Sequence, residues 1–452
     1  MSKADGVASK AKPAGSVPER PWPIRVAMAF AAVAALTLVV ALRRPTGLTE
    51  PTIWAEDGAV FMAVAWQGPG ELFATYAGQF WPLQRGLAFL IGLAPATWWP
   101  TLLYLTGCLG IALAAAVPLL RRGASLFGAL PYRWLLALLI ALLPGAFEAQ
   151  GNITNLHWWA MAALLLLAAM PAPAGKVSKA AELGVFAVVG LTGPTALFVL
   201  PVALWRVLTS DRSSRYLWAR VVVLAASSVV VALAALVGGR ADGNAASVVD
   251  LPGYLYVKWG GTLTLGESLM DSSDLTAASP EMVLAGVIIA VLLALALVDI
   301  RGPSWIWLST GLAAAVAGAL VGARTGDPGS LLEPRNMTRY SVPLLCVSMA
   351  VLVRGVARPG GSDSDKWRRV TAAGGLILVV LGVLGDARLP AAGPATDPAQ
   401  LASLRECYDG RPPYAEAVGC PVDVVPDGWT LVVLRPGYEE LRSELKPGLS
   451  GS

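Results

Sequence analysis

Two adjacent carboxylates, Glu56 and Asp57, are the residues of this sequence best placed to do chemistry. They belong to the segment Trp54-Ala55-Glu56-Asp57-Gly58, which follows shortly after the first long apolar run. Apolar neighbours such as Trp54 and Phe61 would partly remove a carboxylate from water, which raises its pKa and makes it usable as a general base. Because Asp-Gly is also a common turn signal, a solvated loop turn is the alternative. We favour a catalytic pair, with Asp57 as the base.

A second polar segment runs from Glu148 to Trp159, between two apolar runs. It contains an acid, three amides, the only histidine of the chain and two tryptophans. Amides form directional hydrogen bonds and indoles stack on sugar faces, so the segment predicts recognition of a polyhydroxylated or phosphorylated headgroup. The alternative is membrane anchoring by the tryptophans beside a hydrogen-bonded histidine. The candidate binding residues are Glu148, Asn152, Asn155 and His157.

A third group of candidates comes just before a late apolar run. Arg335 and Arg339 are four residues apart and can share one helix face, and Tyr340 adds a neutral donor. Arginine at a membrane rim can bind a phosphate through two parallel hydrogen bonds, although snorkelling at a helix end is the alternative. Weaker candidates for the same phosphate or sugar are Arg85, Tyr254 and Lys258.

Other kinds of site leave no pattern in the sequence. There is no nucleotide-binding loop, no Ser/His/Asp arrangement and no metal-ligand cluster. Glu56 or Asp57 together with Glu148 could hold a divalent cation, and no other cofactor is indicated. The net charge of +4 comes from dispersed basic residues, which excludes a nucleic-acid partner.

Long apolar runs join these polar segments and must position them. Of 452 residues, 56% are hydrophobic and 14% are charged, against roughly 25% charged residues in soluble domains. A lipid membrane is therefore the predicted partner, since about 20 apolar residues cross a bilayer as a helix. We predict an all-α polytopic membrane protein with about eleven transmembrane helices, near 23–42, 100–120, 134–147, 158–172, 181–193, 195–209, 217–238, 281–299, 304–322, 339–356 and 370–386.

The charges between these runs predict their orientation. Placing the N-terminus in the cytoplasm puts more Lys and Arg in the inside loops than in the outside ones, so we predict an N-in, C-out chain. The first run is longer than the apolar region of a signal peptide and ends in Arg43-Arg44 without a cleavage site, so it should remain as an anchor. The helix-breaking segment Thr192-Gly193-Pro194 lies between the fifth and sixth runs, which could form either one broken helix or a tight outside hairpin. The charge balance favours the hairpin.

Three regions follow from this order. They are a cytoplasmic N-terminal tail at 1–22, a transmembrane domain at 23–386 with a long first outside loop at 43–99, and an extracytoplasmic C-terminal cap at 387–452. The cap contains a strand-like segment at 429–434. It also contains Cys407 and Cys420, which lie on the oxidising side and could form a disulfide contributing about 3 kcal/mol. Cys108 and Cys346 fall within apolar runs and are predicted to be packing residues.

The pattern resembles the GT-C superfamily, the multi-pass glycosyltransferases that take sugars from polyprenyl-phosphate carriers, and is most similar to its uncharacterised bacterial members. The resemblance rests on Trp54-Ala55-Glu56-Asp57-Gly58, Asn155-Leu156-His157-Trp158, Arg339-Tyr340 with Pro343, and Pro426-Asp427-Gly428-Trp429. In that superfamily an acidic residue of the first outside loop is the general base, which implies Asp57, or Glu56 if the pair is read the other way. Late-span arginines there meet the lipid phosphate, which implies Arg339.

The resemblance implies an inverting transfer of a sugar to an extracytoplasmic glycan or glycolipid at a bacterial cell membrane, with Arg335 and Arg339 stabilising the departing phosphate. A lipid-linked sugar flippase or another transporter is an alternative, but would be expected to carry polar residues at the middle of its spans. A non-catalytic envelope scaffold is a further alternative, for which the cap is the main argument.

Overall fold

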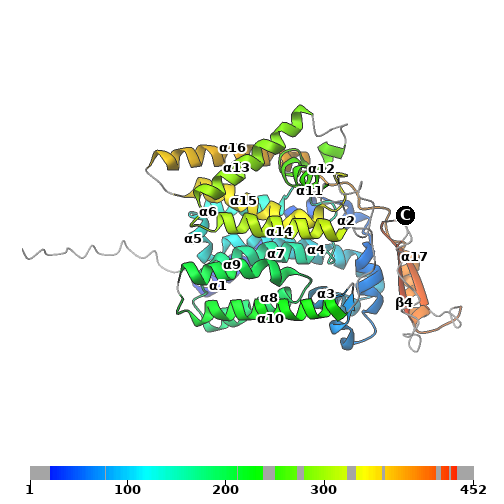
Figure 1. Cartoon of the computed structure of the whole chain (residues 1–452). Helices are drawn as coiled ribbons and strands as arrows, with labels where there is room; N and C mark the ends of the chain where they lie inside the picture. The colour runs from blue at the N-terminus through cyan, green and yellow to red at the C-terminus, as the bar shows by residue number, and fades with distance from the viewer. Residues whose placement is uncertain are drawn as a thin grey trace, which may run out of the picture.

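The computed structural model is mostly helical, and its long helices run side by side in one bundle (Figure 1). The residues that it describes are 21–76, 78–210, 212–237, 250–271, 279–322, 332–358, 362–413, 419–426 and 429–434. A helix occupies each predicted apolar run. These helices are α1 (Trp22–Leu42), α4 (Trp99–Ala116), α6 (Leu130–Ala141), α7 (Leu156–Ala169), α8 (Lys176–Gly190), α9 (Thr195–Thr209), α10 (Arg215–Val237), α13 (Pro280–Val298), α14 (Ser304–Gly322), α15 (Val342–Ala357) and α16 (Asp363–Gly385).

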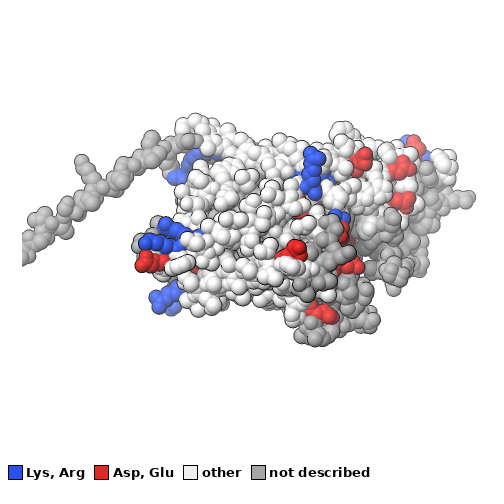
Figure 2. Space-filling model, turned by 90° about the horizontal axis from the view of Figure 1, so that it is seen from above, with Lys and Arg blue, Asp and Glu red and all other residues white. Residues whose placement is uncertain are grey.

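Seven helices of the described chain are long and apolar enough to cross a membrane. An eighth span results if the bent pair Arg121–Phe127 and Leu130–Ala141, with an angle of 91°, is counted as one. The helices α7 and α9 are apolar but shorter. In the space-filling view the middle of the visible face carries few charged side chains, while Lys and Arg gather toward one end (Figure 2). The chain is therefore a polytopic helical membrane protein, while the count of eleven spans and the orientation stay predictions.

The fifth and sixth runs form two separate helices. Both α8 and α9 pack against α10. In the middle of α8, Glu182 accepts hydrogen bonds from Tyr216 and Arg220, which lie near the start of α10. Gly190, at the end of α8, lies against Ser227 further along α10, so α8 and α10 run in the same direction, and α9, which leads back to the start of α10, runs in the opposite direction. Gly193 lies in the turn between them with φ +59°, a value that glycine adopts without strain.

Short elements fill the connections between the long helices. In the first loop they are α2 (Thr46–Thr49), η1 (Asp57–Phe61), η2 (Met62–Val64), η3 (Pro69–Phe73), β1 (Thr75–Tyr76), β2 (Gln79–Phe80), α3 (Pro82–Gly92) and η4 (Ala96–Trp98). Elsewhere they are η5 (Val117–Leu119), η6 (Arg121–Gly123), α5 (Ala124–Phe127), α11 (Leu251–Leu255), η8 (Tyr256–Gly261), α12 (Thr262–Asp271) and η10 (Thr338–Ser341).

The C-terminal region forms a small cap at one end of the bundle (Figure 1). It consists of α17 (Pro398–Tyr408) and an antiparallel pair, β3 (Gly419–Val424) and β4 (Trp429–Leu434). The predicted disulfide between Cys407 and Cys420 is confirmed and joins α17 to β3, and the predicted strand is confirmed as β4. Cys108 and Cys346 are free and buried, as expected of packing residues. Several parts of the sequence predictions lie outside the described residues: the tail at 1–20, Asp427-Gly428, and the cap residues 414–418 and 435–452.

The cap is attached directly to the loop that carries the acidic pair. Val425 N–H donates to the Ile53 carbonyl at 3.0 Å, and Ala55 N–H donates to the Val425 carbonyl at 2.6 Å. The strand β4 packs on η1 and η2. Gly58 permits this approach, because a Cβ atom there would lie 2.9 Å from a methyl group of Val424. The cap and the first loop therefore form one layer over one end of the bundle, and this layer positions Glu56 and Asp57.

Candidate active site

Asp57 is buried and tied to the second polar segment. Its Oδ2 accepts the Ile153 N–H at 3.0 Å, and its Oδ1 accepts the Thr154 N–H at 2.7 Å together with the Thr154 hydroxyl. Burial raises the pKa of Asp57 to about 7, against the lowering effect of these hydrogen bonds and with a smaller raising contribution from Glu56. Both carboxylate oxygens are occupied by groups of the protein. Asp57 thus holds the segment that leads into α7.

Glu56 has the opposite environment. Its side chain is half-buried, and in the described part of the chain no hydrogen bond or ion pair involves it. It lies close enough to Glu148 to contribute to the raised pKa of that carboxyl, which burial raises most. Burial also raises the pKa of Tyr76 to about 12, with Glu56 adding to the shift and Arg339 opposing it. Glu56 is thus a carboxylate without a fixed protein partner, near the late arginine.

Arg339 and Glu148 form the main ion pair of the site. The Nη1 atom of Arg339 lies 2.5 Å from Glu148 Oε1, and its Nη2 atom lies 3.4 Å from the Tyr340 hydroxyl. The Arg339 side chain is 22% exposed and that of Glu148 is 10% exposed. The second Glu148 oxygen, Oε2, is buried without a hydrogen-bond partner in the described structure. This pair fixes the guanidinium while part of its surface stays accessible.

An aromatic chain connects Arg339 to the loop held by Asp57. Tyr340 meets Trp158 edge-on at 5.2 Å between ring centroids, and Trp158 is 4.4 Å from His157. His157 Nδ1 lies 2.9 Å from the Thr154 carbonyl, which requires the proton on that nitrogen. Trp81 closes the other side of His157, edge-on at 4.9 Å. The structure therefore brings together the first loop, the second polar segment and the late arginine.

Two of the three amides of the second polar segment, Asn152 and Asn155, serve the loop itself. Asn152 and Asn155 both donate from Nδ2 to the Glu148 carbonyl, at 2.8 and 3.0 Å. Asn155 N–H also donates to Asn152 Oδ1 at 3.0 Å. These bonds fold the segment into a compact turn. Both Nδ2 groups donate within this turn, and their contact with a ligand stays a prediction.

The side chains of the weaker candidates Arg85 and Tyr254 contact other groups of the protein. Arg85 is buried near Glu71, at 3.6 Å, on the first loop. Tyr254 is fully buried, and its hydroxyl lies 3.0 Å from the Ser341 hydroxyl. The interactions of both residues are with the protein, and the sequence could not show this because each partner is distant along the chain or on another element.

Lys258 and Arg335 also have structural partners. Lys258 is completely buried and donates to the carbonyls of Pro334, at 2.9 Å, and of Glu333 and Asn336. It holds the turn before η10, and its role as a phosphate ligand stays a prediction. Arg335 pairs with Asp271 at 2.9 Å, and its side chain is 35% exposed. Arg335 is therefore accessible, but it is paired with a different element from Arg339.

Metal-ligand side chains are sparse here. In the ranges described above, no group of three or more His, Cys, Asp or Glu side chains could hold a metal ion. Asp57, one of the suggested ligands, is occupied by Ile153 and Thr154. Glu56 and Glu148 are the carboxylates that face the same region.

Sequence reasoning missed three contributors. Gln84 is fully buried and its Nε2 lies 3.2 Å from the Thr154 carbonyl, so α3 also supports the loop. A polar residue in an otherwise apolar short helix is a signal for such a role. Thr154 was visible within the polar segment, but nothing showed that it contacts Asp57. Tyr76, near Glu56 and Arg339, had no distinguishing pattern.

Comparison with known proteins gives limited information. No protein-family model and no curated protein matches the chain. Among solved structures, one similar chain is the archaeal oligosaccharyltransferase AglB from Archaeoglobus fulgidus in complex with an inhibitory peptide and a dolichol-phosphate, at 12% identity and a TM-score of 0.39, over 88% of this chain and 59% of that chain. Another is the Archaeoglobus fulgidus oligosaccharyltransferase in complex with Zn and sulfate, at 13% identity and a TM-score of 0.33, over 85% and 56%. The chain spans less than two thirds of the length of these structures.

Proposed function

We propose that this protein is a GT-C-type membrane glycosyltransferase that moves a sugar from a polyprenyl-phosphate carrier to an extracytoplasmic hydroxyl acceptor, a glycan or glycolipid of a bacterial envelope. The observation that supports the proposal is that Glu56 interacts electrostatically with Arg339 at the end of the bundle that the cap covers. One is a carboxylate without a fixed partner, and the other is a guanidinium that is partly accessible.

The reaction would use these two groups in complementary roles. Glu56 takes the proton of the acceptor hydroxyl, and the resulting oxygen attacks the anomeric carbon from the side opposite the phosphate. The bond between that carbon and the phosphate oxygen breaks, so the anomeric configuration inverts. Arg339 stabilises the charge that develops on the departing lipid phosphate. Glu148 orients Arg339 through their ion pair.

Asp57 has a positioning role in this proposal. The sequence favoured Asp57 as the base, but its oxygens accept hydrogen bonds from Ile153 and Thr154 and it is only 1% exposed. An acceptor hydroxyl would have to displace these bonds to reach it. We therefore assign the base to Glu56, the other member of the acidic pair.

A reconstituted assay tests the proposal. The full chain would be placed in liposomes with a radiolabelled polyprenyl-phosphate sugar and extracted envelope glycolipids. We expect labelled glycolipid and free polyprenyl phosphate in equal amounts, with inverted configuration at the new linkage by NMR. Arg339→Lys keeps the charge but loses the planar fork, and should slow transfer by about tenfold or more. Movement of the labelled lipid between leaflets without any transfer would instead support a flippase.

A further inference from the structure

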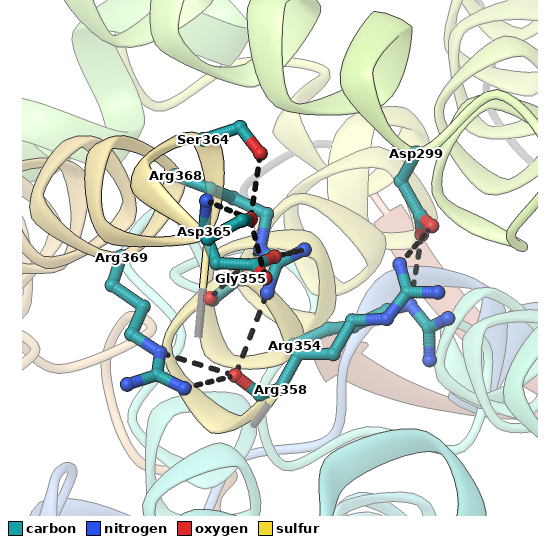
Figure 3. Close-up of polar contacts among 9 residues, drawn as sticks. Asp299, Arg354, Gly355, Arg358, Ser364, Asp365, Arg368 and Arg369 are labelled. Atoms are coloured by element: carbon teal, nitrogen blue, oxygen red, sulfur yellow. Dashed lines mark hydrogen bonds and ion pairs between the residues drawn. The ribbon is translucent and has the colours of Figure 1, made fainter. Parts of the chain in front are cut away.

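A cluster of arginines lies where α15 ends and α16 begins, at the opposite end of the bundle from the cap (Figure 3). Asp299, which follows α13, accepts hydrogen bonds from Arg354 Nε at 2.9 Å and from Arg358 Nη1 at 2.5 Å. On α16, Arg368 pairs with Asp365 at 2.9 Å. These ion pairs fix three guanidinium groups at the junction of three helices.

The Arg358 carbonyl, at the end of α15, organises two further contacts. Arg369 donates to it from Nε at 3.1 Å and from Nη2 at 2.9 Å, and Arg368 donates from Nη2 at 3.4 Å. The C-terminal end of a helix carries a partial negative charge, which favours cations there. Capping of α15 therefore explains why these side chains are held in place, but it does not neutralise them.

The cluster has an excess of positive charge. Its arginines, 354, 358, 368 and 369, outnumber its two buried or half-buried carboxylates, on Asp299 and Asp365. A recess lies between the end of α13 and the helices α14, α15 and α16, and its lining includes Asp299, Ser304, Arg354, Arg358 and Arg368. The Arg358 side chain at its edge is 46% exposed. The chemistry of this recess suits an anion with several acceptor oxygens.

Apolar side chains lead directly away from the cluster along the outside of the bundle. On α13, Leu297 and Val298 are 69% and 64% exposed, and on α16, Val370 and Ile377 are 63% and 65% exposed. Trp367, next to Arg368, is 72% exposed, and tryptophan prefers the headgroup level of a membrane. The helices α13 and α16 pack on each other, so exposed apolar side chains of two neighbouring helices lie beside the arginines.

We infer that this cluster binds the phosphate-bearing headgroup of an anionic phospholipid whose acyl chains lie along α13 and α16. Arginine binds phosphate through two parallel hydrogen bonds, and basic recesses between helices at the cytoplasmic leaflet favour anionic headgroups. The end of the molecule concerned is the one predicted to face the cytoplasm. The inference is independent of sugar transfer, which would take place at the other end.

Lipid titration of the full chain in uncharged detergent tests the inference, with native mass spectrometry as the readout. We expect phosphatidylglycerol to bind at least about tenfold more tightly than phosphatidylcholine. Arg369→Gln should weaken phosphatidylglycerol binding by about fivefold, the effect of one basic residue near an anionic surface. Arg358→Gln should have a similar effect, and if the loss of one of the two arginine partners of Asp299 prevents folding, Arg369→Gln carries the test alone.

The matched control is Lys366→Gln, because Lys366 is on the same turn of α16 but is 72% exposed and paired with Asp363. This variant should change phosphatidylglycerol binding by less than about twofold. Equal binding of the two lipids would overturn the inference, as would an equal loss with Lys366→Gln, since the attraction would then be diffuse. Full competition by inorganic phosphate at the concentration of the lipid would also overturn it, because a free anion would then be the ligand.

Discussion

Replacing Asp57 with Asn should loosen the loop at 148–156 while leaving Glu56 in place. Asp57 accepts from both Ile153 and Thr154, so an amide can satisfy one of these donors but turns its own NH2 group toward the other. A buried N–H that loses its acceptor costs about 1–3 kcal/mol. The hydrogen bond of the Ile153 N–H is the one expected to be lost, because at 3.0 Å it is longer than the 2.7 Å bond of the Thr154 N–H.

Hydrogen exchange measured by mass spectrometry reports this change directly. A loss of about 1–3 kcal/mol corresponds to about 5- to 150-fold faster exchange at the amides of Ile153 and Thr154, if they exchange by local opening. Glu56→Gln is the matched control, since this neighbouring side chain makes no described hydrogen bond, and it should change the exchange by less than about twofold. Unchanged protection in Asp57→Asn, or an equal loss in both variants, would refute the positioning role of Asp57.

Three further predictions concern stability in detergent. Burial raises the pKa of Asp57 from 3.8 to about 7, so the folded protein keeps a proton that the unfolded chain releases. The free energy of unfolding, compared with that of Asp57→Asn, should therefore fall by about 1.4 kcal/mol per pH unit from about pH 4 to 7 and stay constant above about pH 7. Thermal unfolding at several pH values measures this. Arg339→Gln leaves the buried carboxylate of Glu148 without its ion-pair partner and should lower the free energy of unfolding by about 2 kcal/mol. The more accessible Arg335→Gln should lower it by less than about 1 kcal/mol. Equal melting temperatures of the two variants would contradict this. Replacing Cys407 and Cys420 with Ser should destabilise the cap by about 3 kcal/mol, visible as faster proteolysis there, and unchanged proteolysis would count against it.

The sequence predicted the helices well because long apolar runs carry a strong and local signal. It also predicted the disulfide between Cys407 and Cys420 and the strand at 429–434, since the spacing of the two cysteines and the β-branched and aromatic residues of the segment could be read directly. The docking of the cap on the first loop was not predictable. It depends on backbone hydrogen bonds of Val425 with Ile53 and Ala55, which leave no trace in residue types.

The candidate site was predicted in part. The segments around Glu56, His157 and Arg339 were identified, and the structure brings them together. The separate roles of their residues were not evident, because role depends on burial and on partners far along the chain. Lys258 shows this well, because its bonds to the carbonyls of Glu333, Pro334 and Asn336, far along the chain, could not be read from its residue type.

The assignment of Glu56 as the base is tested most directly by sugar transfer from a polyprenyl-phosphate sugar in reconstituted membranes, comparing Glu56→Gln with Asp57→Asn. General-base catalysis contributes about 10²- to 10⁴-fold, so Glu56→Gln should lose at least about 100-fold while exchange at Ile153 stays as in the wild type. Asp57→Asn should lose less activity and show faster exchange. Transfer by Glu56→Gln at the wild-type rate would contradict the account.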